Sequence, residues 1–109
     1  MIWNVRYLKE AEEDLKRLDN SQRIEVLKGI KKVSQNPLPQ NQGGYGKPLG
    51  NHNGVNLTGL LKIKYKNLGI RVVYKVEIVQ SEMIIVVISI RDDEEVYQLA
   101  NKRRVENDL

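Results

Sequence analysis

The segment that decides the fold is LLKIKYKNLGIRVVY, residues 60–74. Its two halves alternate apolar and polar residues, the period of a strand that is buried on one face. Between the halves, residues 66–69 include Asn and Gly, which tolerate the backbone conformations of tight turns. The segment therefore predicts an antiparallel hairpin.

The turn length predicts the register of this hairpin. An even-numbered loop in which Tyr65 pairs with Ile70 places Lys64 opposite Arg71. Lys62 shares the face of Lys64, because alternate residues of a strand point the same way. Opposed like charges destabilise a sheet, so three cations without a nearby carboxylate indicate an external anion as their partner. The alternative is an ordinary exposed face whose long side chains spread apart in water.

A second strand signal follows the hairpin and leads into a helix. Residues 83–90 are almost wholly apolar and β-branched, which is typical of a central strand buried on both faces. Asp92 can cap the final helix, with Glu95 completing a capping-box pair. The helix would face the core with Val96, Leu99 and Ala100.

The N-terminal third predicts a strand and a helical hairpin. Residues 2–7 alternate like a half-buried strand. Two helical stripes follow at spacings of three and four, and the second ends before Pro37. The first stripe is Leu8, Ala11, Leu15 and Leu18, and the second is Ile24, Leu27, Ile30 and Val33.

Residues 36–54 hold all three prolines and five glycines, a composition that predicts a long connecting loop. The order of elements is then strand, two helices, three antiparallel strands and a helix. This order predicts one α+β domain spanning residues 1–109, with a mainly antiparallel sheet and the helices on one of its faces.

Composition and charge limit the classes of function that this chain can have. Nine basic and no acidic residues lie between residues 26 and 76, a clustering that favours a polyanionic partner, although a solvated basic face is the alternative. The absence of cysteine excludes disulfides and thiolate chemistry. The chain start lacks the pattern of a signal peptide, and no stretch has the composition of a membrane span, so we expect a cytoplasmic protein.

Three motifs resemble those of RelE-like toxins, members of the RelE/ParE toxin-antitoxin superfamily. They are GLLKIKY at 59–65, GIRVVY at 69–74 and VISIRDDEEVY at 87–97. The resemblance covers nearly the whole chain in order and spacing. It implies a fold like the small microbial ribonucleases, and cleavage of messenger RNA on the ribosome without a metal ion or other cofactor.

The resemblance also implies roles for individual residues. Lys64 would be the general base that removes the proton of a ribose 2′-hydroxyl, while Lys62 and Arg71 would hold the scissile phosphate. Arg91 would stabilise the leaving 5′-oxygen or supply its proton, and Tyr97 would stack on a nucleotide or orient it. Such a site suits an internal nucleophile, which must be aligned and deprotonated while charge builds on the phosphate.

Further contacts and partners complete these expectations. Lys47 and Lys66 are expected to contact RNA, and Arg103, whose charge suits the C-terminus of the last helix, is expected to touch RNA phosphates as well. The partners would be a cognate antitoxin, the messenger RNA in the ribosomal A site and the ribosome with its 16S rRNA, and no membrane is expected.

Two other functions stay open. One is noncatalytic inhibition of DNA gyrase, as in the related ParE toxins. The other is an RNA-binding relative with weakened catalysis, because the connection before Arg91 is shorter than is usual in the family. The acidic run at residues 92–95 suits a helix N-terminus, with metal binding as its alternative.

Overall fold

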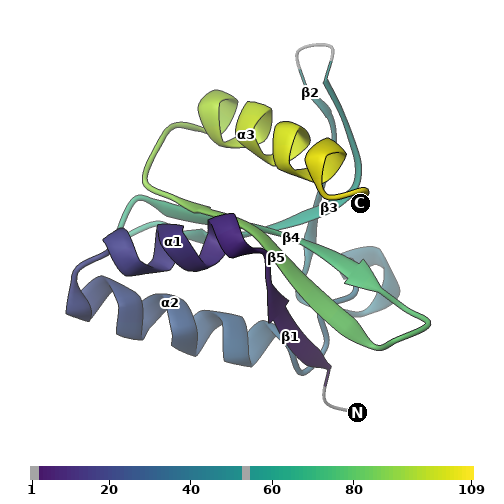
Figure 1. Ribbon diagram of the computed structural model, residues 1–109. Helices are drawn as coiled ribbons and strands as arrows, with labels where there is room; N and C mark the ends of the chain where they lie inside the picture. The colour runs from purple at the N-terminus through teal and green to yellow at the C-terminus, as the bar shows by residue number, and fades with distance from the viewer. Residues whose placement is uncertain (1–2, 53–54) are drawn as a thin grey trace.

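The sheet has five strands in the order β1-β5-β4-β3-β2 (Figure 1). The computed structural model describes residues 3–52 and 55–109. Pairing is antiparallel throughout except between β1 and β5, which run parallel. The strands are β1 (Asn4–Tyr7), β2 (Lys47–His52), β3 (Val55–Tyr65), β4 (Ile70–Glu77) and β5 (Glu82–Ser89).

The predicted hairpin register is confirmed. Tyr65 pairs with Ile70 and Lys64 with Arg71 across β3 and β4. Gly69 ends the turn with a φ of +65°, a left-handed conformation that favours glycine. The apolar strand β5 lies between β1 and β4, as its composition predicts, and its residues from Met83 to Ile88 are all buried.

The described residues also form three α-helices, α1 (Lys9–Arg17), α2 (Asn20–Val33) and α3 (Asp93–Glu106), and a short 3-10 helix, η1 (Gln40–Gln42). A capping box starts α2, in which the Asp19 carboxylate accepts from the backbone N–H of Gln22 at 2.8 Å. Asp92 caps α3 by accepting from the backbone N–H of Glu95 at 3.0 Å. In the described part of the chain, no helix has the length and apolar character needed to cross a bilayer.

The helices cover both faces of the sheet, so the expectation of a single covered face is wrong. Tyr65 of β3 donates to the backbone carbonyl of Val26 in α2. Lys62, three residues earlier in the same strand and therefore on the other face, reaches Tyr97 in α3. Figure 1 shows α3 and α2 on opposite sides of the sheet, with α1 between them. Both faces are covered because the central strands are apolar on both.

The buried stripe of α2 differs from the predicted one. Val26, Ile30 and Val33 are buried, whereas Ile24 is 45% exposed and Leu27 is 40% exposed. Packing against Tyr65 selects this face of the helix. A side chain at Gly29 would collide with the Tyr65 ring, so glycine at this position lets the ring lie against the helix.

The segment 36–54 is not one long loop, because β2 pairs with β3 along the sheet edge. Residues 53 and 54 lie outside the described residues. Before β2, the Tyr74 hydroxyl donates to the backbone carbonyl of Pro37 at 2.8 Å. Burial raises the pKa of Tyr74, so the hydroxyl keeps its proton and remains a donor. Gly46 lies against Tyr74 and Leu61 where a side chain would not fit.

Two substitutions in α2 test which stripe is buried. Ile30→Ala should lower the free energy of unfolding by about 2–5 kcal/mol, because it leaves a cavity at a side chain that is 2% exposed. Leu27→Ala, at a 40% exposed position, should cost less than about 1 kcal/mol. Denaturant unfolding of both variants measures the difference, and equal losses would contradict the observed packing.

Candidate functional site: a cationic face beside the last helix

The predicted site residues gather on the face of the sheet that α3 covers. We call the set Lys47, Lys62, Lys64, Arg71 and Arg91 the cationic face. The register places Lys47 of β2 opposite Lys62 of β3, and Lys64 of β3 opposite Arg71 of β4. Lys47 and Lys64 are exposed, as is Lys66 in the turn. The expected convergence of Lys62, Lys64 and Arg71 is therefore present.

Lys62 and Tyr97 form one contact of the cationic face. The Lys62 ammonium donates to the Tyr97 hydroxyl at 2.8 Å and lies 5.5 Å from the centre of the ring. Tyr97 is only 5% exposed. Stacking of Tyr97 on a nucleotide does not fit this burial, because a stacked base needs an open ring face. The contact instead orients the Lys62 ammonium.

Arg71 contacts a carboxylate and a backbone carbonyl at the start of α3. Its guanidinium forms an ion pair with the Asp93 carboxylate. It also donates to the backbone carbonyl of Arg91 at 3.0 Å. The expectation that the cations have no nearby carboxylate is wrong, since Asp93 is distant in sequence and is brought to Arg71 by the packing of α3.

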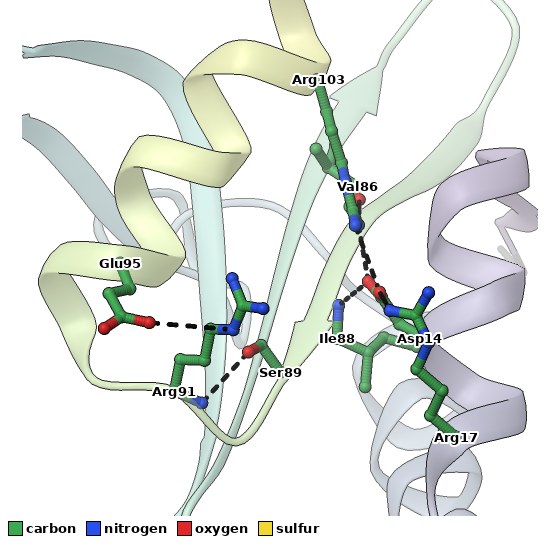
Figure 2. A network of polar contacts seen from close by, with 8 residues as sticks. All are labelled: Asp14, Arg17, Val86, Ile88, Ser89, Arg91, Glu95 and Arg103. Atoms are coloured by element: carbon green, nitrogen blue, oxygen red, sulfur yellow. Dashed lines mark hydrogen bonds and ion pairs between the residues drawn. The ribbon is translucent and has the colours of Figure 1, made fainter.

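Arg91 joins the cationic face through its backbone carbonyl, which accepts from Arg71, while its side chain lies toward α3. Its backbone N–H donates to the Ser89 hydroxyl at 3.1 Å, and its guanidinium lies 3.7 Å from a Glu95 carboxylate oxygen (Figure 2). Both side chains of the pair are more than half exposed, so the ion pair is weak. The Arg91 guanidinium remains available to an incoming anion.

The acidic run therefore has three local roles. Asp92 caps α3, Asp93 neutralises Arg71, and Glu95 pairs with Arg91. Among the described residues, no three His, Asp or Glu side chains are grouped in a way that could hold a metal ion. The observed contacts agree with the helix N-terminus interpretation of this run.

The expectation that Arg103 contacts RNA is wrong, because its side chain is buried. It is 8% exposed. Its guanidinium makes two contacts with the Asp14 carboxylate, at 2.5 and 3.2 Å, and donates to the backbone carbonyl of Val86 at 3.0 Å. Asp14 also accepts from the backbone N–H of Ile88 at 3.0 Å. Figure 2 shows this network joining α1, β5 and α3.

Sequence reasoning missed Asp14, although a signal was available. Asp14 lies three residues after Ala11 and four before Leu18, so it belongs to the buried stripe of α1. A carboxylate on a buried stripe needs a charged or hydrogen-bonding partner. The partner could not be identified from sequence, because Arg103 is far along the chain.

Removing one partner of this buried pair should be costly. Arg103→Met should lower the free energy of unfolding by about 3–5 kcal/mol, because the buried Asp14 carboxylate then keeps only the backbone N–H of Ile88 and a weak ion pair with the exposed Arg17. The double variant Asp14→Leu with Arg103→Met should recover most of that loss. Lys102→Met, at an exposed neighbouring position, is the control in denaturant unfolding. If Arg103→Met lowers the free energy of unfolding no more than Lys102→Met does, the buried pair does not stabilise the fold as described.

Comparison with known proteins gives a family match. The family profile described as the ParE toxin of the type II toxin-antitoxin system parDE matches residues 5–97. No curated protein matches the chain in sequence.

Solved toxin structures share the fold. Free E. coli RelE with two arginine-to-alanine substitutions is 21% identical, with a TM-score of 0.72 over 94% of this chain and 98% of that chain. Isolated E. coli RelE is 21% identical, with a TM-score of 0.67 over 93% and 97% of the two chains. A chain of the Mycobacterium tuberculosis RelBE2 toxin-antitoxin complex is 22% identical, with a TM-score of 0.66 over 84% and 100%.

These identities are too low to transfer an activity, but they agree on the architecture described above. The family profile spans most of the chain, from β1 to the first turns of α3. The chain therefore belongs to the ParE toxin family and is a toxin of the RelE/ParE superfamily of type II toxin-antitoxin systems.

Proposed function

We propose that this toxin is a messenger RNA endoribonuclease that acts in the ribosomal A site, in the cytoplasm, without a metal ion. The observation that supports this most is the position of Lys64 directly opposite Arg71, with Arg71 joined to the backbone of Arg91. The proposed proton acceptor and the proposed phosphate ligand are then neighbours on one face of the sheet, and the residue proposed to act on the leaving group adjoins them through its backbone.

In the proposed reaction the ribose 2′-oxygen attacks the adjacent phosphorus. Lys64 must act here as its neutral amine, which accepts the proton of the 2′-hydroxyl and becomes an ammonium as the new oxygen–phosphorus bond forms. Lys62 and Arg71 neutralise the charge that builds on the phosphate oxygens. The bond to the 5′-oxygen breaks beside Arg91, and this oxygen takes a proton from solvent. The products are a 2′,3′-cyclic phosphate and a 5′-hydroxyl.

The proposal includes two macromolecular partners. The ribosome with its 16S rRNA would present the messenger RNA, with Lys47 and Lys66 contacting RNA beside the site. A cognate antitoxin would cover the cationic face with an acidic or amphipathic segment. Structures of related RelE toxins have been solved in complex with antitoxins, which supports this second partner.

Induced expression with primer extension on a translated messenger RNA tests the activity. Wild type should arrest growth and cut within codons, and Lys64→Ala and Arg91→Ala should each lower cleavage by at least about a hundredfold, because each removes a group acting on the reacting atoms. Lys31→Ala, an exposed lysine on α2, is the charge-matched control and should cleave like wild type. Intact messenger RNA under wild-type growth arrest would contradict the proposal.

Inhibition of DNA gyrase is the second candidate. It is favoured by the ParE description of the matching family. The carboxylates paired with Arg71 and Arg91 also favour it over cleavage, because they compete with an RNA phosphate for these two cations. Supercoiling assays with purified gyrase distinguish the two functions. A toxin that arrests growth, leaves messenger RNA intact and blocks supercoiling acts through gyrase.

The ion pair between Arg71 and Asp93 gives a further prediction. An RNA phosphate must compete with Asp93 for Arg71, so Asp93→Asn should raise RNA affinity by up to about fivefold, the equivalent of about 1 kcal/mol for a partly exposed pair. Glu94→Gln removes the same charge from the same helix at an exposed position and controls for net charge. Fluorescence anisotropy with 2′-O-methyl RNA measures the RNA affinity of both variants. Equal gains in affinity would mean that net charge, and not the release of Arg71 from Asp93, causes the effect.

A further inference from the structure

A pocket of about 300 Å³ lies immediately beside Arg91. It is enclosed by the end of α1, the first turn of α2, the end of β5 and one side of α3. Its volume is at the lower end of the range for small-ligand pockets, roughly 300–1,000 Å³. The residues that matter for its chemistry are Arg17, Leu18, Gln22, Ser89, Arg91 and Leu99.

The pocket is held open by the buried network under it. Asp14, which is 7% exposed, joins α1 to the Ile88 backbone of β5 and to Arg103 of α3. Buried polar contacts therefore fix three of the four elements that line the pocket relative to one another. A ligand would enter a site that is already formed, with little ordering cost.

The walls combine cations with an apolar floor. Arg17 and Arg91 flank Asp14 and Ser89 in the view of Figure 2, and their side chains are 76% and 59% exposed. Each makes only a weak ion pair, at 3.8 Å to Asp14 and 3.7 Å to Glu95. Leu18 and Leu99 supply apolar surface between them. A nucleotide matches this distribution, because its phosphate would meet the arginines at the rim and its flat base would lie on the apolar floor.

Gln22 supplies a polar edge. Its side-chain oxygen accepts from the backbone N–H of Asp19 at 3.2 Å as part of the α2 capping box. This contact orients its side-chain amide, whose N–H groups are donors. Hydrogen-bonding groups of this kind recognise the edge of an unstacked base in single-stranded RNA.

The pocket continues the row of residues that would bind the scissile phosphate. Ser89 pairs with Arg71, which pairs with Lys64, so the three lie in line across β5, β4 and β3. Neighbouring strands are about 4.8 Å apart, so this row spans roughly 10 Å. RNA bound at Lys64 and Arg71 would therefore extend past Arg91 into the pocket.

We infer that this pocket is a nucleotide subsite of the toxin. It takes the base of a nucleotide next to the cleavage position, with Arg17 contacting a phosphate and Gln22 contacting the base edge. The inference rests on the proposed function for its choice of RNA as ligand, and it adds a residue set on α1 and α2 that would influence which sequence is cut.

Titration of the purified toxin with a fully 2′-O-methylated trinucleotide, followed by amide NMR, tests the subsite. We expect shifts at Leu18, Ser89 and Leu99, and at least fivefold weaker binding for Arg17→Ala, because this change removes a charge-assisted hydrogen bond to a phosphate. Lys16→Ala is the matched control, because Lys16 is an exposed neighbour in α1 that does not line the pocket. Gln22→Glu keeps the capping acceptor and should also weaken binding.

The outcomes separate this inference from the proposed function. Equal affinities of Arg17→Ala and Lys16→Ala, no binding, or shifts confined to the hairpin would overturn the subsite, even if wild type cleaves messenger RNA. Amide shifts at the pocket residues, together with weaker binding by Arg17→Ala than by Lys16→Ala, would support the subsite even if wild type cuts no RNA.

Discussion

The register of the β3–β4 hairpin is the constraint on which the rest of the structure depends. A shift of one residue would move Lys62, Lys64 and Arg71 to the face covered by α2 and bring Tyr65 to the other. The turn prevents such a shift, because Gly69 takes a left-handed conformation that fixes Tyr65 opposite Ile70. Tyr65 then packs against Gly29 and thereby also selects the buried stripe of α2.

A second constraint joins the helices to this hairpin. The buried contacts of Asp14 with Arg103 and with the Ile88 backbone connect α1, α3 and β5. Because α3 is held there, Asp93 meets Arg71 and Tyr97 meets Lys62. The cationic face is therefore made by the sheet but adjusted by α3, which supplies both its positioning tyrosine and its competing carboxylates.

Local patterns predicted the α+β class, the three α-helices of the described residues, the hairpin register and the placing of Lys62, Lys64 and Arg71 on one face. They failed where tertiary contacts decide the outcome. The buried stripe of α2 depends on Tyr65, and the edge strand β2 forms within a Gly- and Pro-rich segment because β3 offers it a pairing edge. The burial of Arg103 depends on Asp14, a partner that no local pattern can identify.

The most direct test of the account is cleavage in a reconstituted system, with purified ribosomes holding a defined codon in the A site. The account predicts products that end in a 2′,3′-cyclic phosphate and a 5′-hydroxyl, and it predicts that a single 2′-deoxy substitution at the nucleotide before the scissile phosphate abolishes cleavage. Cleavage that persists at the deoxy-substituted position would contradict attack by the 2′-hydroxyl, and with it the roles assigned to the cationic face.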